Sequence, residues 1–101
     1  MKDMNKTTII YHPVYQKFTE YDGQGQIIQE GSFKIDGRQE TIFENDRATV
    51  MFLGDNSKGV AKIHPDDIPN LKMGRSIAYL RARISSYKKL LRNKIKETHG
   101  K

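Results

Sequence analysis

Residues 7–64 contain short runs in which apolar and polar side chains alternate, and turn-forming residues separate these runs. Alternation with a period of two places the apolar side chains on one face of a β-strand. Both faces of the run at 48–53 are apolar, which predicts a central or covered strand. The sequence therefore predicts an antiparallel β-meander of five to six strands, drawn from the runs 7–12, 14–21, 26–30, 32–35, 38–43, 47–53 and 58–64.

Four short segments rich in Gly, Asn and Asp predict where this meander reverses. They lie at 22–25, 36–37, 44–46 and 54–57. Asp36-Gly37 is the strongest of them, because Asp-Gly readily adopts the positive φ values that a two-residue type I′ turn requires. We therefore expect the chain to reverse at Asp36-Gly37 and to form a tight hairpin between the two flanking strands.

The spacing of apolar residues changes after Pro65. The apolar positions now follow one another at alternating intervals of four and three residues, which is the pattern of one helix face and of a heptad seam: Met73, Ile77, Leu80, Ile84, Tyr87 and Leu91. This pattern predicts one long amphipathic helix at about 71–97, with Asn70 as its N-cap. Ser85-Ser86 is its weakest point and a place for a bend, because serine competes for backbone hydrogen bonds.

The two patterns together predict an α+β fold, with a β-meander followed by one long basic C-terminal helix. We expect a flexible arm at 1–6, a single domain at 7–98 and a frayed tail at 99–101. The helix would be about 40 Å long, whereas strands of about six residues span about 20 Å. Its second half should therefore project beyond the sheet, while its first half lies on the sheet through Met73, Ile77, Ala78, Leu80 and Ile84.

Positive charge is concentrated in the predicted helix. The 101 residues contain 18 Lys and Arg against 12 Asp and Glu, which gives a formal net charge of +6. Residues 1–70 hold eight basic and eleven acidic residues, a net charge of −3, whereas residues 71–101 hold ten basic residues and only Glu97, a net charge of +9. A helix that needed only solubility would mix Glu with Lys. Helices of one sign are usual where the partner is a polyanion or an acidic protein surface.

Two kinds of partner agree with this helix. The leading prediction is a small non-enzymatic accessory protein that binds nucleic-acid phosphates with low sequence specificity, through seven basic residues: Arg81, Arg83, Lys88, Lys89, Arg92, Lys94 and Lys96. The alternative is an effector or inhibitor that binds an acidic surface of a host protein through the same helix. In that case the apolar anchors are Tyr87, Leu91 and Ile95.

Self-association through this helix is restricted by charge. A parallel coiled coil would place Arg83 opposite Lys88 of its mate, so we expect no parallel homodimer. An antiparallel pair, or packing on the acidic sheet region of another copy, remains open.

The sequence predicts no catalytic, metal or cofactor site. Residues 54–59 have the glycine spacing of a phosphate-binding loop but lack the Lys and Ser/Thr that follow it, so a hairpin turn is the better interpretation. His64, Asp66 and Asp67 could share a proton or a metal, yet a strand end followed by helix capping explains them better. The chain has no cysteine, no apolar run of membrane-spanning length and no secretory leader, so we expect a cytoplasmic protein.

Two segments carry a resemblance to known proteins. Residues 59–67 read GVAKIHPDD, and residues 74–83 read GRSIAYLRAR. This pair resembles a motif, G-x-A-K-x-x-P-x-D followed by G-x-x-I-A-x-x-R-A, found in small proteins of unknown function encoded by phages and prophages of Gram-positive bacteria. The resemblance implies a β-meander followed by a helix, in a phage or mobile-element setting, and it implies no catalytic residue.

Overall fold

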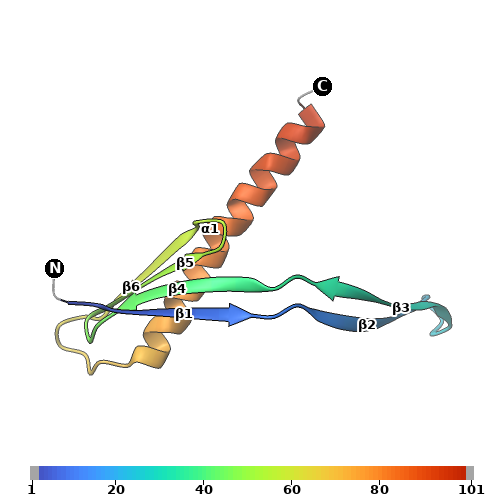
Figure 1. Cartoon of the computed structure of the whole chain (residues 1–101). Coiled ribbons are helices and arrows are strands. Elements are labelled where there is room, and N and C mark those ends of the chain that lie inside the picture. The colour runs from blue at the N-terminus through green and yellow to red at the C-terminus, as the bar shows by residue number, and fades with distance from the viewer. Residues whose placement is uncertain (1–2, 100–101) are drawn as a thin grey trace.

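The computed structural model describes residues 3–99, which form six antiparallel strands followed by one long helix (Figure 1). The predicted α+β class, with its antiparallel strands and its long C-terminal helix, is confirmed. The elements are β1 (Asn5–Tyr11), β2 (Val14–Tyr21), β3 (Ile27–Ile35), β4 (Arg38–Glu44), β5 (Ala48–Leu53), β6 (Lys58–Lys62) and α1 (Leu71–His99).

The first half of the chain is one long two-stranded ribbon rather than two successive hairpins. β1 pairs with β4 and β2 pairs with β3, and both ladders keep the same register, with Tyr11 opposite Arg38 and Val14 opposite Ile35. The chain therefore passes residues 36–37 without reversing, and the predicted hairpin turn at this point is wrong. Figure 1 shows the two strands running side by side through this break.

The break arises from the residues that face each other across it. Pro13 has no N–H, so it cannot donate to the ladder. A Cβ atom on Gly37 would lie 2.5 Å from the Tyr11 carbonyl oxygen. Glycine is therefore needed at position 37 for the close approach of the opposite strand, and not for a turn.

The ribbon reverses at its far end, where the sequence predicted a loop at 22–25. The Asp22 carboxylate Oδ1 accepts hydrogen bonds from the backbone N–H groups of Gln24 and Gln26, at 2.8 Å and 2.9 Å. Gly25 has a φ of 82°. The predicted turns at 44–46 and 54–57 are also confirmed, and they join β4 to β5 and β5 to β6.

The four-stranded sheet has the order β1-β4-β5-β6, so β5 is central, as its two apolar faces predicted. Helix α1 packs on β5 and β6 through small residues spaced four apart, which are Gly74, Ala78, Ala82 and Ser86. We call these four residues the small-residue stripe. Together with the sheet they enclose a thin core, whose buried apolar residues are Ile42, Met51, Leu53, Ala61, Ala78 and Ala82.

The predicted packing face of α1 is correct for two of its five residues and wrong for the other three. Ala78 is buried and Ile77 is partly buried, but the side chains of Met73, Leu80 and Ile84 are 56%, 59% and 53% exposed. The physical reason is close approach, because small side chains bring the helix axis nearer to the sheet than large ones. A Cβ atom on Gly59 of β6 would overlap the backbone of α1 at Ala78 and Ala82. Met73, Leu80 and Ile84 consequently face away from the sheet.

Two arms project from this small core. The radius of gyration is 18.8 Å, against about 13 Å for a compact chain of this length. The β2–β3 ribbon forms one arm and the C-terminal part of α1 forms the other, and they leave the sheet in different directions (Figure 1). The projection of the helix beyond the sheet agrees with the length predicted from the sequence.

The observed elements extend further towards both termini than the sequence predicted. Strand β1 begins at Asn5, inside the segment predicted as a flexible arm, and α1 runs without interruption through Ser85-Ser86 to His99. Residues 1–2 and 100–101, which belong to the predicted arm and tail, lie outside the described residues. No helix within residues 3–99 combines the length and the apolar content needed to cross a membrane.

Candidate binding surface on helix α1

The rotation of α1 on the sheet is set by polar contacts along its inner side. The helix begins at its predicted N-cap, where Asn70 Oδ1 accepts a hydrogen bond from the Met73 N–H at 3.0 Å. One turn further, Arg75 reaches Glu44 on β4. Arg81 then donates to the Val60 carbonyl oxygen on β6 at 2.7 Å. These contacts fix which side chains face the sheet and which face outward.

Arg75 and Glu44 form the most buried of these contacts. The Glu44 side chain is 6% exposed, and Arg75 Nε donates to both of its carboxylate oxygens at 3.0 Å, with a further bond from a terminal guanidinium nitrogen. The hydrogen bond to Glu44 raises the pKa of the Arg75 guanidinium above its ordinary value. This pair attaches the first turns of α1 to β4.

Replacing Arg75 should therefore destabilise the fold. In Arg75→Gln, the buried Glu44 carboxylate loses its counter-charge, and we expect the free energy of unfolding to fall by about 2 kcal/mol. Urea denaturation followed by circular dichroism measures this change. The double variant Arg75→Gln/Glu44→Gln should recover part of the loss, and a single Arg75→Gln variant as stable as the wild type would contradict the assignment.

Asp55, in the β5–β6 turn, anchors the helix further along. Its carboxylate accepts hydrogen bonds from the Ser57 N–H at 2.9 Å and from the Ser86 hydroxyl at 2.8 Å, and its carbonyl oxygen accepts one from Lys89 Nζ at 3.4 Å. The hydrogen bond from the Ser57 backbone N–H, with the one from the Ser86 hydroxyl adding to it, lowers the pKa of Asp55 from 3.8 to about 2. Ser86 is thus a packing and anchoring residue rather than a weak point.

This lowered pKa predicts an acid-dependent loss of stability. Because the ionised Asp55 carboxylate is favoured in the folded chain, its contribution is complete above about pH 4 and is lost as the pH falls towards about 2. Urea denaturation midpoints measured across this range should fall more steeply for the wild type than for Asp55→Asn. Identical pH profiles for the two proteins would show that Asp55 does not anchor the helix.

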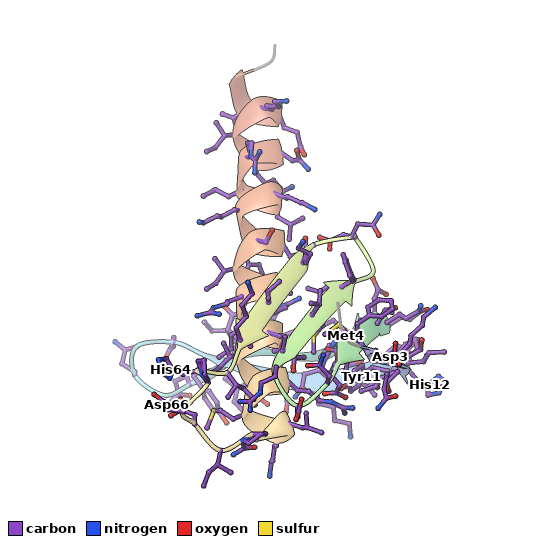
Figure 2. All side chains as sticks on the ribbon, turned by 90° about the vertical axis from the view of Figure 1, so that its left-hand side faces the viewer. Asp3, Met4, Tyr11, His12, His64 and Asp66 are labelled. Atoms are coloured by element: carbon purple, nitrogen blue, oxygen red, sulfur yellow. The ribbon has the colours of Figure 1, made fainter. Side chains whose placement is uncertain are left out.

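The outer side of α1 carries a continuous apolar line, which we call the outward seam. Its members are large, more than half exposed and spaced as a heptad seam: Met73, Leu80, Ile84, Tyr87 and Leu91. At about 100° per residue they lie opposite the small-residue stripe. Figures 1 and 2 show the C-terminal part of α1 standing clear of the sheet. Residues 90–98 are all exposed.

The predicted anchors belong to this outer side. Tyr87, Leu91 and Ile95 are 55%, 62% and 49% exposed. The Arg83 guanidinium lies 4.4 Å from the centre of the Tyr87 ring and donates to its hydroxyl, so the ring is held by a cation on one margin of the seam.

The seven predicted basic residues divide into three groups. Arg81 and Lys89 contact the sheet and the β5–β6 turn, so their charges also serve the fold. Lys94 lies 3.8 Å from Glu97. The others are Arg83, Lys88 and Arg92, on the outer and lateral sides of the helix, and Lys96, which lies beyond the sheet in line with Ala78. In heptad terms, Arg81 and Lys88 occupy one margin of the outward seam and Arg83 the other.

The sequence prediction missed the N-terminal half of this surface. It assigned Met73, Leu80 and Ile84 to the core, because a heptad line is usually the packed face of a helix. A second periodicity was present at 74, 78, 82 and 86, where Gly, Ala, Ala and Ser recur every four residues. Two lines on opposite sides of one helix indicate two packing partners.

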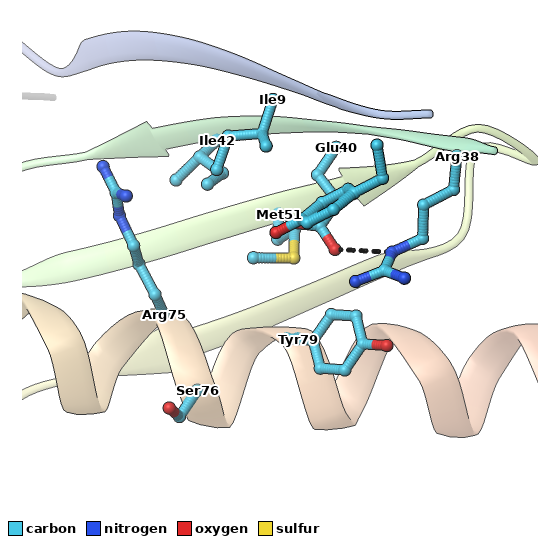
Figure 3. Close-up of a pocket in the computed structure, with 9 residues that line it drawn as sticks. Ile9, Arg38, Glu40, Ile42, Met51, Arg75, Ser76 and Tyr79 are labelled. Carbon is cyan, nitrogen blue, oxygen red and sulfur yellow. Dashed lines mark hydrogen bonds and ion pairs between the residues drawn. The ribbon is translucent and has the colours of Figure 1, made fainter. Parts of the chain in front are cut away.

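A hollow lies between β1, β4 and the first half of α1 (Figure 3). Arg38 Nε lies 3.1 Å from Oε2 of Glu40, whose side chain is 4% exposed, and the Arg38 guanidinium lies 3.9 Å from the centre of the Tyr11 ring. Tyr11 also donates to Glu40 at 3.4 Å, and Tyr79 lines the hollow from the helix. These polar groups are paired with one another, so we interpret them as a structural network that holds β1 and β4 together.

His64 and Asp66 lie together in the loop before α1, away from the projecting part of the helix (Figure 2). Both side chains are exposed, at 67% and 90%, with His64 Nδ1 3.7 Å from an Asp66 carboxylate oxygen. His64 Nδ1 also accepts a hydrogen bond from the Asp66 N–H at 3.2 Å. This geometry is a local turn at the end of β6.

No family model matches this chain, and no curated protein or solved structure matches it. The surface of α1 and the projecting ribbon are therefore the features from which a function can be argued.

Proposed function

We propose that this chain is a non-enzymatic, cytoplasmic binding module that docks an acidic protein surface through the outward seam of α1. The observation that carries the proposal is the seam itself. Five large apolar side chains form one line on the face of the helix that points away from the core, and each is more than half exposed. Exposed apolar surface that is contiguous and rimmed by polar residues is characteristic of protein interaction sites.

The chemistry of the seam favours a protein over a nucleic acid. A phosphate backbone is contacted mainly by cations and polar groups, so it would leave the apolar line facing water. A protein partner would cover that line, and each large side chain fully buried contributes about 1.5–3 kcal/mol. Apolar residues at the centre with charges at the margin are the usual organisation of a protein interface.

The margins of the seam specify the charge of the partner. Lys88 lies along one margin, and Arg83 lies along the other. A basic partner would meet like charge on both sides, which costs binding free energy. The surface that fits is therefore apolar at its centre and acidic at its edges.

A retention experiment separates a protein partner from a nucleic acid. The full chain is immobilised, exposed to a Gram-positive bacterial lysate with and without nuclease, and compared with Lys88→Gln/Arg92→Gln. We expect protein that presents an acidic surface to be retained after nuclease treatment, with binding only moderately weakened in the variant. Loss of all binding on nuclease treatment would contradict the proposal.

The nucleic-acid prediction has its own measurable outcome. Fluorescence anisotropy with a labelled duplex and a labelled single strand would then give a log–log salt slope of roughly −4 to −5, for about five neutralised phosphates. If the chain shows such a slope, and a variant with Leu91→Asp in the outward seam still binds nucleic acid fully, phosphate binding replaces the protein-docking proposal.

A further inference from the structure

The ribbon formed by β2 and β3 has an apolar face that the rest of residues 3–99 leaves open. Every residue of both strands is exposed. Because paired residues in a ladder share a face, the register brings four large apolar side chains together: Val14, Phe18, Phe33 and Ile35. Their exposed fractions lie between 37% and 55%. A two-stranded ribbon is marginally stable at best in water, so this face requires a cover.

The tip of the same ribbon is acidic. Residues 18–33 contain three acidic residues and no Lys or Arg, whereas residues 81–96 of the helix contain seven basic residues and no Asp or Glu. Glu20 lies two residues beyond Phe18, on the apolar face and towards the tip. The ribbon thus combines an apolar centre with negative charge beyond it, which is the complement of the outward seam.

We propose that the partner docked on the outward seam is the β2–β3 ribbon of a second copy of this chain. This inference rests on the proposed function. The apolar face of the ribbon, from Val14 to Phe18, is about 14 Å long. The part of the seam from Leu80 to Leu91 is about 16 Å long, so the two surfaces match in length.

Charge sets the direction of docking. With the ribbon tip towards the C-terminus of α1, the acidic residues of the tip lie beside the cations that follow Leu91, which are Arg92, Lys94 and Lys96. In the reverse direction the tip would lie beside the first turns of the helix, where the basic residues are Lys72 and Arg75, and Arg75 is already paired with Glu44. The first orientation is therefore favoured.

A dimer can cover the two apolar surfaces that a single copy leaves exposed, which are the ribbon face and the outward seam. Within one chain the ribbon and the projecting part of α1 leave the sheet in different directions (Figure 1). Around a two-fold axis, each copy places its ribbon on the helix of the other, so that both apolar faces are covered and the assembly closes. Parallel pairing of the two helices would instead bring Arg83 towards Lys88.

Because the chain contains no cysteine, single introduced cysteines report this contact directly. Gln16→Cys lies on the apolar face of the ribbon, and Lys88→Cys lies on the margin of the seam. Equimolar mixtures of these two full-length variants are oxidised and separated without reductant. The matched control replaces Gln16→Cys with Lys17→Cys, which lies on the opposite face of the same ribbon.

We expect a dimer by analytical ultracentrifugation and a mixed cross-link in the test pair at least about tenfold above the control pair. Phe18→Asp should weaken the dimer at least about a hundredfold, whereas Thr19→Asp on the opposite face should leave it intact. If Phe18→Asp disturbs the ribbon itself, the cross-link between Gln16→Cys and Lys88→Cys, which both keep Phe18, still tests whether the ribbon contacts the seam.

The other outcomes overturn the inference in distinguishable ways. A monomer that retains an acidic protein through the seam removes the second copy as partner and leaves the proposed function standing. A dimer cross-linked through Lys88→Cys on both copies shows helix pairing instead. A monomer that binds only nucleic acid overturns the inference and the proposed function together.

Discussion

Gly59→Ala is expected to lower the free energy of unfolding by about 3 kcal/mol or more. The added Cβ atom would overlap the carbonyl group of Ala78 and the backbone nitrogen of Ala82, on the helix that packs against β6. Backbone atoms cannot rotate away as a side chain can. The helix would have to move off the sheet and open the thin core that it shares with β5.

Gly23→Ala is the matched control for this substitution. The same methyl group is added in the loop at the tip of the ribbon, where nothing lies within 4 Å of it. We expect this variant to stay within about 0.5 kcal/mol of the wild type in urea denaturation. Equal stabilities for the two variants would show that α1 does not approach β6 as closely as described.

Leu91→Asp is expected to weaken partner binding at least about a hundredfold while leaving the fold intact. Leu91 is 62% exposed, so the substitution removes no buried contact within the chain. It does place a charge on the surface that a partner must desolvate, and the cost of burying an unpaired carboxylate falls on the complex alone. Isothermal titration or sedimentation with the identified partner measures the loss.

Asn93→Asp provides the comparison for charge. It adds the same carboxylate two residues further along, at a position turned about 160° away from Leu91 around the helix. Binding within about threefold of the wild type is expected. If Asn93→Asp weakened binding as much as Leu91→Asp, net charge rather than the seam would control the interaction.

The sequence predicted the existence and extent of α1 well but assigned its faces wrongly. A heptad line and the Asn70 cap are local features, and they were sufficient to place the helix. Which side of α1 faces the sheet depends on Gly59 of β6, which lies 19 and 23 positions before the helix residues that it approaches, Ala78 and Ala82. The close approach of α1 to β6 becomes apparent only when Gly59 and the small-residue stripe, which are distant in the sequence, are seen to face each other.

The prediction of a turn at Asp36-Gly37 was wrong for a similar reason. Asp-Gly is a strong turn former when it stands alone, but the register of β1 with β4 places His12-Pro13 across from it. The glycine is then required by the carbonyl of Tyr11 on the opposite strand. Local turn propensity could not reveal this, because the opposing residues are more than twenty positions away in the sequence.

The candidate site was predicted in part. The positions of the cations on the helix followed from the sequence, but the engagement of Arg81 and Lys89 depends on where β6 and the Asp55 turn end in space. The apolar anchors Tyr87 and Leu91 were predicted to be only partly covered, and they are exposed. The sequence could not show that the outward seam extends back to Met73, because this depends on how α1 is rotated on the sheet.

The most direct test of the outward seam compares Ile84→Asp with Ala82→Asp. The two positions are two residues apart and about 200° apart around α1, with exposed fractions of 53% and 0%. We predict that Ile84→Asp keeps its helical circular dichroism and its monomer stability within about 0.5 kcal/mol, but loses its partner. Ala82→Asp should unfold, because it buries an unpaired charge. Unfolding of Ile84→Asp to the same extent would place the seam in the core and contradict its role as a docking surface.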